Sequence, residues 1–232
     1  NFKIEQELKN SNWPQEFASN TNNISNIDYA DNKVLLLKSS RLSKNFRDND
    51  YTAKNTVFYD DKIISYDHKG SIFVYSLASK KKILEYNFYK KTFKNYNKKI
   101  FLVINNDIIY AADNLGYIYA VNINSGALVW AKNYGIPFRS NIKFYDDQVF
   151  LASQDNVLYS INSISGEKNW QLSTSLTFLK SEFKNNLALD ELNNNVIFLN
   201  TSGELYSVNY VTQRINWVLN FRNLSSKNEA NL

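Results

Sequence analysis

The residue types that perform most protein chemistry are scarce in this sequence. It contains no Cys and a single His, His68, among 232 residues. This composition excludes a disulfide framework, a thiolate metal site and a cysteine nucleophile, and it leaves no second His for a metal site. A general base also needs a substrate pocket, and no residues that would form one stand out around His68. We therefore expect His68 to be an exposed turn residue.

Acidic side chains, the other common catalytic groups, cluster where the chain is expected to turn. Asp and Asn tolerate a left-handed backbone and bond to their own chain, so pairs of them between β-type runs predict tight hairpin turns with solvated carboxylates. The predicted turns are Asp60-Asp61, Asn105-Asn106, Asp146-Asp147 and Asn193-Asn194-Asn195. Asp107, Asp113 and Asp155 lie at strand ends beside turns and have the same interpretation. No Gly-rich phosphate loop, Gly-x-Ser-x-Gly elbow or His-Glu-x-x-His string is present, so we predict no catalytic residue, cofactor or metal.

Basic and aromatic residues alternate in one part of the chain. Lys80-Lys81-Lys82, Lys90-Lys91 and Lys98-Lys99 are interleaved with Tyr and Phe. Such a mixture suits a solvated strand edge, a surface for anionic lipid or protein, or a single-stranded nucleic acid. We favour the solvated edge and predict no nucleic-acid partner, because 27 Lys and Arg against 22 Asp and Glu give a net charge of only +5.

The elements that would position these residues repeat along the chain. Gly116–Trp130, Asn156–Trp170 and Gly203–Trp217 are similar strings that each end in Trp, and an eroded copy begins at Gly70 with Tyr86 in the Trp place. Within each string apolar and polar residues alternate with the period of a β-strand. Four short strands in units of about 40–47 residues are typical of a β-propeller blade.

The sequence therefore predicts an all-β fold of four-stranded antiparallel blades. We expect a lead-in over residues 1–30, blades over 31–222 and a polar tail over 223–232. The four repeats fall near 55–89, 99–133, 139–174 and 180–222, and Val34–Lys38 is one further strand. Four blades make either a complete small ring or part of a larger one, and we favour half of an eight-bladed ring.

The repeated strings resemble the PQQ-like propellers, whose blades carry a pattern like Gly-x-Leu-Tyr-Ala-Leu-Asp-x-x-Thr-Gly-x-x-x-Trp. Gly116–Trp130 matches nearly throughout, whereas in the last string Gln213 replaces the turn Gly. Trp13-Pro14-Gln15 is similar to the start of one subgroup, BamB, the propeller lipoproteins of the outer-membrane β-barrel assembly machinery. The resemblance covers residues 11–222.

This resemblance implies a non-catalytic scaffold that helps β-barrel proteins to assemble and insert. It implies a periplasmic protein, peripheral to the outer membrane, that binds a BamA-type barrel-assembly subunit and also unfolded outer-membrane protein substrates. The lipid anchor of the subgroup is a Cys, which this chain lacks, so an anchor would precede Asn1 or be absent. The alternatives are a fragment of a quinoprotein dehydrogenase, whose central channel holds PQQ and Ca²⁺, and another secreted binding propeller.

Two places are candidates for partner binding. In the subgroup, a Leu-rich loop with a basic end follows the Trp of one blade and docks on the assembly subunit. The corresponding residues here are Leu176, Phe178, Leu179 and Lys180. Phe178 and Leu179 could instead begin the next inner strand. Arg139 begins another inner strand, where it would either contact a partner from the central channel or pin a neighbouring blade, and we favour the pin.

The repeated Trp and Gly residues have a structural interpretation. The Gly at the last turn of the first two Trp strings, Gly126 or Gly166, supplies a positive φ without strain. An indole that lies over the neighbouring blade buries about 150–250 Å². We therefore predict that five residues staple the blades together: Trp130, Trp170, Trp217, Gly126 and Gly166.

Overall fold

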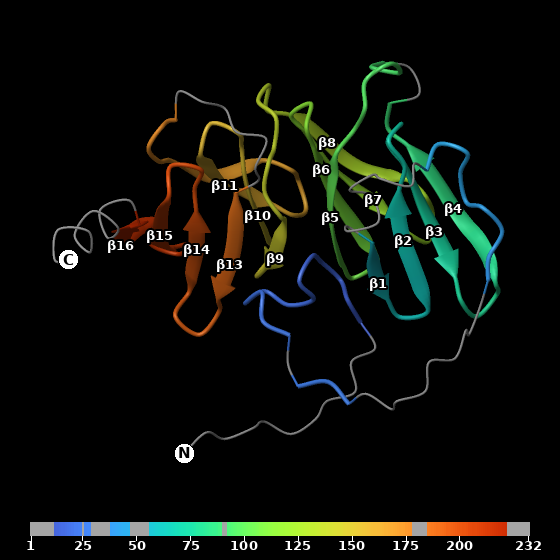
Figure 1. The fold of residues 1–232 in the computed structure, drawn as a ribbon, viewed down its shortest axis with the longest axis horizontal. Helices are drawn as coiled ribbons and strands as arrows, with labels where there is room; N and C mark the ends of the chain where they lie inside the picture. The colour runs from blue at the N-terminus through green and yellow to red at the C-terminus, as the bar shows by residue number, and fades with distance from the viewer. Residues whose placement is uncertain are drawn as a thin grey trace, which may run out of the picture.

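The computed structural model describes residues 12–24, 26–28, 38–46, 56–89, 92–177 and 185–221. These contain sixteen strands in four antiparallel sheets, each with its strands in chain order from inner to outer (Figure 1). The all-β, bladed architecture expected from the sequence is confirmed. Among the described residues, no helix is long and apolar enough to cross a membrane. The predicted strand Val34–Lys38 lies outside the described residues except for Lys38.

The four sheets are called blades 1 to 4. Blade 1 consists of β1 (Val57–Tyr59), β2 (Lys62–Tyr66), β3 (Ser71–Ser76) and β4 (Lys81–Asn87). Blade 2 consists of β5 (Ile100–Asn105), β6 (Ile108–Asp113), β7 (Tyr117–Asn122) and β8 (Leu128–Asn133). Blade 3 consists of β9 (Lys143–Tyr145), β10 (Gln148–Ala152), β11 (Val157–Asn162) and β12 (Lys168–Ser173). Blade 4 consists of β13 (Asn186–Asp190), β14 (Asn195–Leu199), β15 (Glu204–Asn209) and β16 (Arg214–Asn220).

The first hairpin of each blade turns on Asp or Asn, as predicted. Asp60, Asn106, Asp146 and Asn194 all have positive φ, between 47° and 56°. In blades 1 to 3 these short polar residues adopt the left-handed conformation that a two-residue hairpin needs, whereas in blade 4 Asn194 ends a longer loop over 191–194. The third turn of blades 2, 3 and 4 is held by the side chain of Asn122, Asn162 or Asn209, whose Oδ1 accepts hydrogen bonds from two backbone N–H groups further along the turn.

One row of side chains crosses each blade, and in blades 1 to 3 it faces the blade that comes next; we call it the facing row. Register defines it, because paired residues point to the same side of a sheet. The rows are Val57–Ile64–Val74–Leu84, Val103–Tyr110–Ala120–Trp130, Lys143–Phe150–Ser160–Trp170 and Ala188–Ile197–Ser207–Trp217. The first three rows contribute to the three apolar clusters that join consecutive blades.

The expectation that Tyr86 takes the Trp place in blade 1 is wrong. Leu84 takes it, because Leu84 pairs with Val74 just as Trp130 pairs with Ala120, and both pairs lie beside the same bulge. Tyr86 pairs with Ile72, two residues beyond this position. The position within the repeat, and not the aromatic character, identifies the equivalent residue.

The N-terminal segment runs across the inner strands of all four blades. Trp13 pairs with Phe58 of β1, and Gln15 pairs with Val103 of β5. Further along, the Ser19 carbonyl accepts a hydrogen bond of 2.6 Å from Lys143 Nζ on β9. The backbone carbonyl of Asn20 accepts a 2.8 Å bond from the backbone N–H of Leu189 on β13. The segment thus ties the four sheets along their common inner edge (Figure 1).

Candidate functional site

The loop after β12 presents an exposed leucine on an anchored backbone. Leu176 is 74% exposed. The carbonyl of the residue before it, Ser175, accepts hydrogen bonds from Asn156 Nδ2 at 2.9 Å and from Ser202 Oγ at 3.1 Å. On the other side, the hydroxyls of Thr177 and Thr201 lie 3.3 Å apart. Hydrogen bonds on both sides of Leu176 fix its backbone while its side chain stays exposed to water. Such a leucine can contribute apolar contact area to a partner with little further loss of conformational entropy.

Asn156 organises this loop, a role that the sequence did not indicate. Its side chain is fully buried and its φ is 59°. Its Oδ1 accepts from Thr201 Oγ1 at 2.8 Å, while its Nδ2 donates to Ser175 on the loop. Asn156 occupies the place that Gly116 and Gly203 take in the neighbouring repeats. An Asn at a Gly position indicates left-handed backbone, but the partners of its amide depend on the tertiary structure.

Three of the predicted loop residues, Phe178, Leu179 and Lys180, lie outside the described residues. Whether they extend the Leu176 surface or begin an inner strand therefore stays a prediction. Among the described residues, β13 begins at Asn186, eight positions after Phe178.

Arg139 lies where blade 3 meets blade 4. Its backbone carbonyl accepts a 2.7 Å bond from the Asn185 N–H, and its own N–H donates 3.0 Å to Ala152. The pairing of the two blades continues at Asn141, whose amide exchanges two bonds of 2.8 Å with the backbone of Leu187. The Arg139 side chain is half-buried. Its backbone joins the two blades, and a contact of its side chain with a protein partner stays a prediction.

The rim of blades 1 and 2 carries a polar cluster that overturns two expectations from the sequence. His68 is buried, not exposed, and its Nδ1 contacts the carbonyl of Asn45. Asp113 is fully buried, not solvated, and accepts a hydrogen bond from the Tyr89 hydroxyl. The expectations failed because each turn is covered by a segment distant in sequence, which no local pattern reveals.

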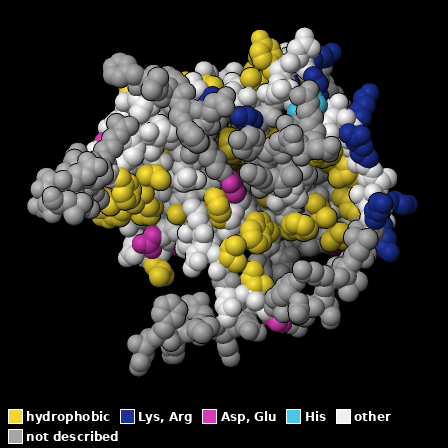
Figure 2. Space-filling model, viewed as in Figure 1, with side chains coloured by type: hydrophobic (Ala, Val, Ile, Leu, Met, Phe, Trp, Pro, Cys, Tyr) yellow, Lys and Arg dark blue, Asp and Glu magenta, His cyan; other side chains and the backbone are white. Residues whose placement is uncertain are grey.

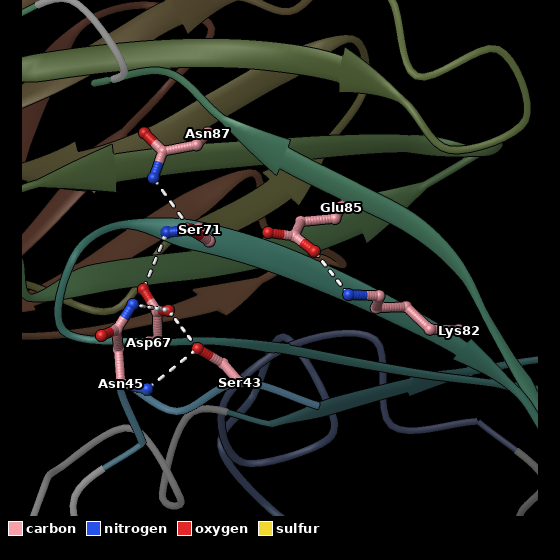
Figure 3. Close-up of polar contacts among 7 residues, drawn as sticks. All are labelled: Ser43, Asn45, Asp67, Ser71, Lys82, Glu85 and Asn87. Atoms are coloured by element: carbon pink, nitrogen blue, oxygen red, sulfur yellow. Dashed lines mark hydrogen bonds and ion pairs between the residues drawn. The ribbon is translucent and has the colours of Figure 1, made fainter. Parts of the chain in front are cut away.

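The two buried aspartates of this rim hold turns together. Asp113 Oδ1 accepts from the N–H groups of Leu115 and Tyr117 at 2.8 and 2.9 Å. Asp67 repeats this arrangement in blade 1, and its second oxygen also accepts from Ser43 at 2.8 Å and from Asn45 at 3.3 Å (Figure 3). These bonds assign both carboxylates a structural role.

Burial shapes the electrostatics of this cluster. Desolvation raises the pKa of Asp113, against the lowering effect of its hydrogen bonds from Tyr89 and from backbone N–H groups. Burial also raises the pKa of Tyr89 and lowers the pKa of Lys98, whose Nζ lies 4.8 Å from the centre of the Tyr89 ring. No group of three or more His, Asp or Glu residues that could hold a metal ion occurs in the described part of the chain.

The basic residues of the sequence separate into an exposed and a buried set. Lys80, Lys81 and Lys82 are exposed, and Lys82 forms an ion pair with Glu85 on the outer strand of blade 1 (Figure 3). Figure 2 shows Lys and Arg side chains along this end of the molecule. Lys98, by contrast, is buried, and its Nζ donates to the carbonyl of Phe93. Lys99 is exposed, and Lys90 and Lys91 lie outside the described residues, so the extent of the basic surface stays a prediction.

The repeated Trp residues differ in their surroundings. Trp130 is 8% exposed, lies against Gly166 of blade 3, and donates from Nε1 to the carbonyl of Ser163 at 2.7 Å. Trp170 is also buried, within the cluster between blades 3 and 4. Gly126 lies against Leu84 in the same way. Trp217, in contrast, is 46% exposed.

Comparisons with known proteins agree with this architecture. The family model described as outer membrane protein assembly factor BamB matches residues 90–229. BamB of Legionella pneumophila (strain Paris) is 30% identical over 69 residues, which are 30% of this chain and 17% of that protein. The chain therefore spans less than a fifth of this curated relative.

Two solved structures share the fold. BamB from Moraxella catarrhalis superposes with a TM-score of 0.56 at 15% identity, over 68% of this chain and 49% of that one. The computationally designed Ika8 protein superposes with a TM-score of 0.57 at 14% identity, over 71% and 48% of the two chains. The chain thus corresponds to about half of each solved structure. Since the family model matches more than half of its residues and its four sheets repeat one blade pattern, the chain belongs to the BamB family of PQQ-like β-propeller proteins.

Proposed function

We propose that this protein is a non-catalytic scaffold that binds other proteins during the assembly and insertion of outer-membrane β-barrels. The proposed location is the periplasm, at the inner surface of the outer membrane, and the proposed partner is a BamA-type assembly subunit. Unfolded barrel proteins are a further proposed ligand. Membership of the BamB family supports this role, and the two buried acids of the described residues, Asp67 and Asp113, are occupied in holding turns.

The observation that carries the proposal is the exposure of Leu176 on an anchored loop. Exposed leucines on mobile loops lose entropy when a partner orders them, whereas this loop is already held at Ser175 and Thr177. Protein interfaces concentrate their binding energy in a few such apolar anchors. Phe178, Leu179 and Lys180 would extend the anchor, and Lys180 would add a cation at its end.

The test is capture of the assembly subunit by purified variants. We expect Leu176→Glu to reduce its retention at least tenfold, because a carboxylate would be desolvated against an apolar pocket. Ile164→Glu is the matched control, since Ile164 is 72% exposed in a turn of the same blade. This control should retain the subunit as well as the wild type does. Equal retention by both variants would refute the proposed surface.

A second measurement separates the scaffold from the quinoprotein alternative. The chain is titrated with pyrroloquinoline quinone in the presence of Ca²⁺, and binding is followed by the absorbance of the quinone. We expect no saturable binding. Saturable, Ca²⁺-dependent binding would contradict the non-catalytic part of the proposal, whatever the result with the assembly subunit.

A further inference from the structure

Two exposed aromatic rings stand at the rim of blades 1 and 2, on the connection between β4 and β5; we call them the aromatic tip. Phe93 is 41% exposed and Tyr96 is 60% exposed, and their rings meet edge to face with centres 6.0 Å apart. The described part of this connection rises above the strand ends at the top of the view (Figure 1). Adjacent exposed rings on a protruding loop are a candidate binding surface.

Hydrogen bonds from the turns of both blades hold the backbone of the aromatic tip. Lys69 Nζ, from the second turn of blade 1, donates to the carbonyl of Lys94 at 3.4 Å. Asn114 Nδ2, from the second turn of blade 2, donates to a carbonyl of the same connection at 3.2 Å. Within the connection, Lys98 Nζ donates to the carbonyl of Phe93. The tip is thus fixed between two described blades, and its rings need little further ordering when they bind.

Folding alone does not explain an aromatic residue at position 93. Phe93 has a φ of 54°, a left-handed conformation that Asn and Gly adopt with less strain. Its ring also contacts Tyr117 of β7, with centres 6.0 Å apart, but the residue stays exposed. A bulky apolar residue that is exposed at a strained position points to a function in binding.

Cations surround the aromatic tip. Lys94 is exposed within the tip, and Lys69 is half-buried in the adjoining turn. Lys44 is exposed on the segment that bonds to Asp67 of that turn. The acids of this rim, Asp67 and Asp113, are buried. Figure 2 shows Lys and Arg side chains, and no Asp or Glu, at the upper right of the view. The described part of the rim therefore presents positive charge to solvent.

We propose that this rim docks on a membrane surface that carries anionic phospholipids. Aromatic side chains favour the interface between water and hydrocarbon, and Lys residues beside them are attracted to phosphate headgroups. A protruding tip can enter a soft interface directly, whereas a protein partner would have to supply a matching pocket. The contact goes beyond the proposed function and does not require the assembly subunit.

Flotation of the 232-residue chain with lipid vesicles tests the contact. We expect binding to vesicles of phosphatidylcholine mixed with phosphatidylglycerol and much weaker binding to vesicles of phosphatidylcholine alone. Binding should fall steeply as the salt concentration rises. Tyr96→Ser and Lys94→Glu should each weaken it about tenfold, because the first removes apolar contact and the second reverses a charge. No assembly subunit is present, so the result is independent of the proposed function.

Matched variants show whether the position of a residue matters. Lys81→Glu makes the same charge change on the exposed outer strand β4, and Ile164→Ser removes an exposed apolar side chain from a turn of blade 3. Both should bind the anionic vesicles as the wild type does. Phe93→Asn should weaken the binding and remain folded, because Asn suits the left-handed backbone.

Three results would overturn the proposal. One is a chain that binds neither kind of vesicle or binds both equally. Another is an equal loss of binding in Lys94→Glu and Lys81→Glu, which would indicate attraction by net charge alone. The third is tighter binding to a single-stranded oligonucleotide or to a poly-glutamate peptide than to the anionic vesicles, which would indicate another class of ligand. Circular dichroism of each variant separates a lost contact from a lost fold.

Discussion

Trp130 and Trp217 are the same residue at the same place in two repeats, yet their surroundings differ. Trp130 is covered by blade 3 and bonds to the carbonyl of Ser163, whereas Trp217 remains nearly half exposed. Both pair with a small residue of the preceding strand, beside the same bulge. The difference therefore comes from the covering sheet and not from the blade that carries the indole: blade 3 lies over Trp130, whereas no sheet of the described residues lies over Trp217.

Each repeat determines where its own Trp lies, and the neighbouring blade determines whether that Trp is buried. The strand pairing, the bulge and the direction of the indole are set within each blade. The free energy gained from the indole depends on a second surface that removes it from water, at roughly 25 cal/mol per Å² of apolar area. A repeated Trp is thus a staple only where another sheet covers it.

The largest effect that we expect is the loss of stability in Trp130→Ala. The change removes a buried indole and leaves the Ser163 carbonyl without this donor, so the free energy of unfolding should fall by about 3–5 kcal/mol. Urea unfolding followed by circular dichroism measures this. A loss below about 1 kcal/mol would contradict the role of Trp130 as a staple, and a fold too unstable to purify would support it.

The next effect isolates the contact between Trp130 and Gly166. A Cβ at Gly166 would overlap the indole of Trp130, whereas a Cβ at Gly135 meets nothing within 4 Å, and both residues have φ of 73°. The backbone strain of the two alanine variants is therefore matched. We expect Gly166→Ala to lower the free energy of unfolding by about 1–3 kcal/mol more than Gly135→Ala does, the usual cost of overpacking. Equal losses of unfolding free energy in the two variants would show that the turn at Gly166 shifts to accept the Cβ without displacing the indole of Trp130.

Much of the fold is predictable because it is encoded locally. The Asp and Asn pairs indicate the hairpins, and the regular spacing of the Trp strings indicates the blades. Leu84 shows the limit of such local patterns. It stands as far after Gly70 as Trp130 stands after Gly116, but its aliphatic side chain hides the equivalence, and the aromatic ring of Tyr86 suggests the wrong residue.

The surroundings of the candidate site are less predictable because they depend on contacts distant in sequence. His68 and Asp113 belong to turns that are usually solvated, and only the segments packed on them explain their burial. The anchoring of Leu176 likewise rests on Asn156 and on Thr201, 45 positions apart in the chain. Nothing in the local pattern of either residue indicates the other.

A smaller effect distinguishes the buried carboxylate of Asp113 from an amide of the same shape. Asn200 caps the corresponding turn of blade 4 by accepting from Ser202 and Glu204, so an amide suits this position. We therefore expect Asp113→Asn to change the free energy of unfolding by less than about 1 kcal/mol at neutral pH.

The pH dependence of the free energy of unfolding, compared between the wild type and Asp113→Asn, tests the direction of the pKa shift of Asp113. Burial raises the pKa of Asp113, so the folded state binds its proton more tightly than the unfolded state does. The stability that this group contributes is fully present below its ordinary pKa and is lost as the pH rises through the raised value. Between the ordinary and the raised pKa of Asp113, the free energy of unfolding of the wild type should thus decline with pH relative to that of Asp113→Asn. Parallel pH profiles would contradict a raised pKa.

The smallest effect should come from Trp217→Ala, because Trp217 is nearly half exposed. An exposed side chain loses little when it is truncated, so the free energy of unfolding should change by about 0.5 kcal/mol or less. Urea unfolding of this variant beside Trp130→Ala makes the comparison direct. If both substitutions cost the same, another surface must cover Trp217 in solution. A large difference would show that the covering blade, and not the indole, supplies the stability.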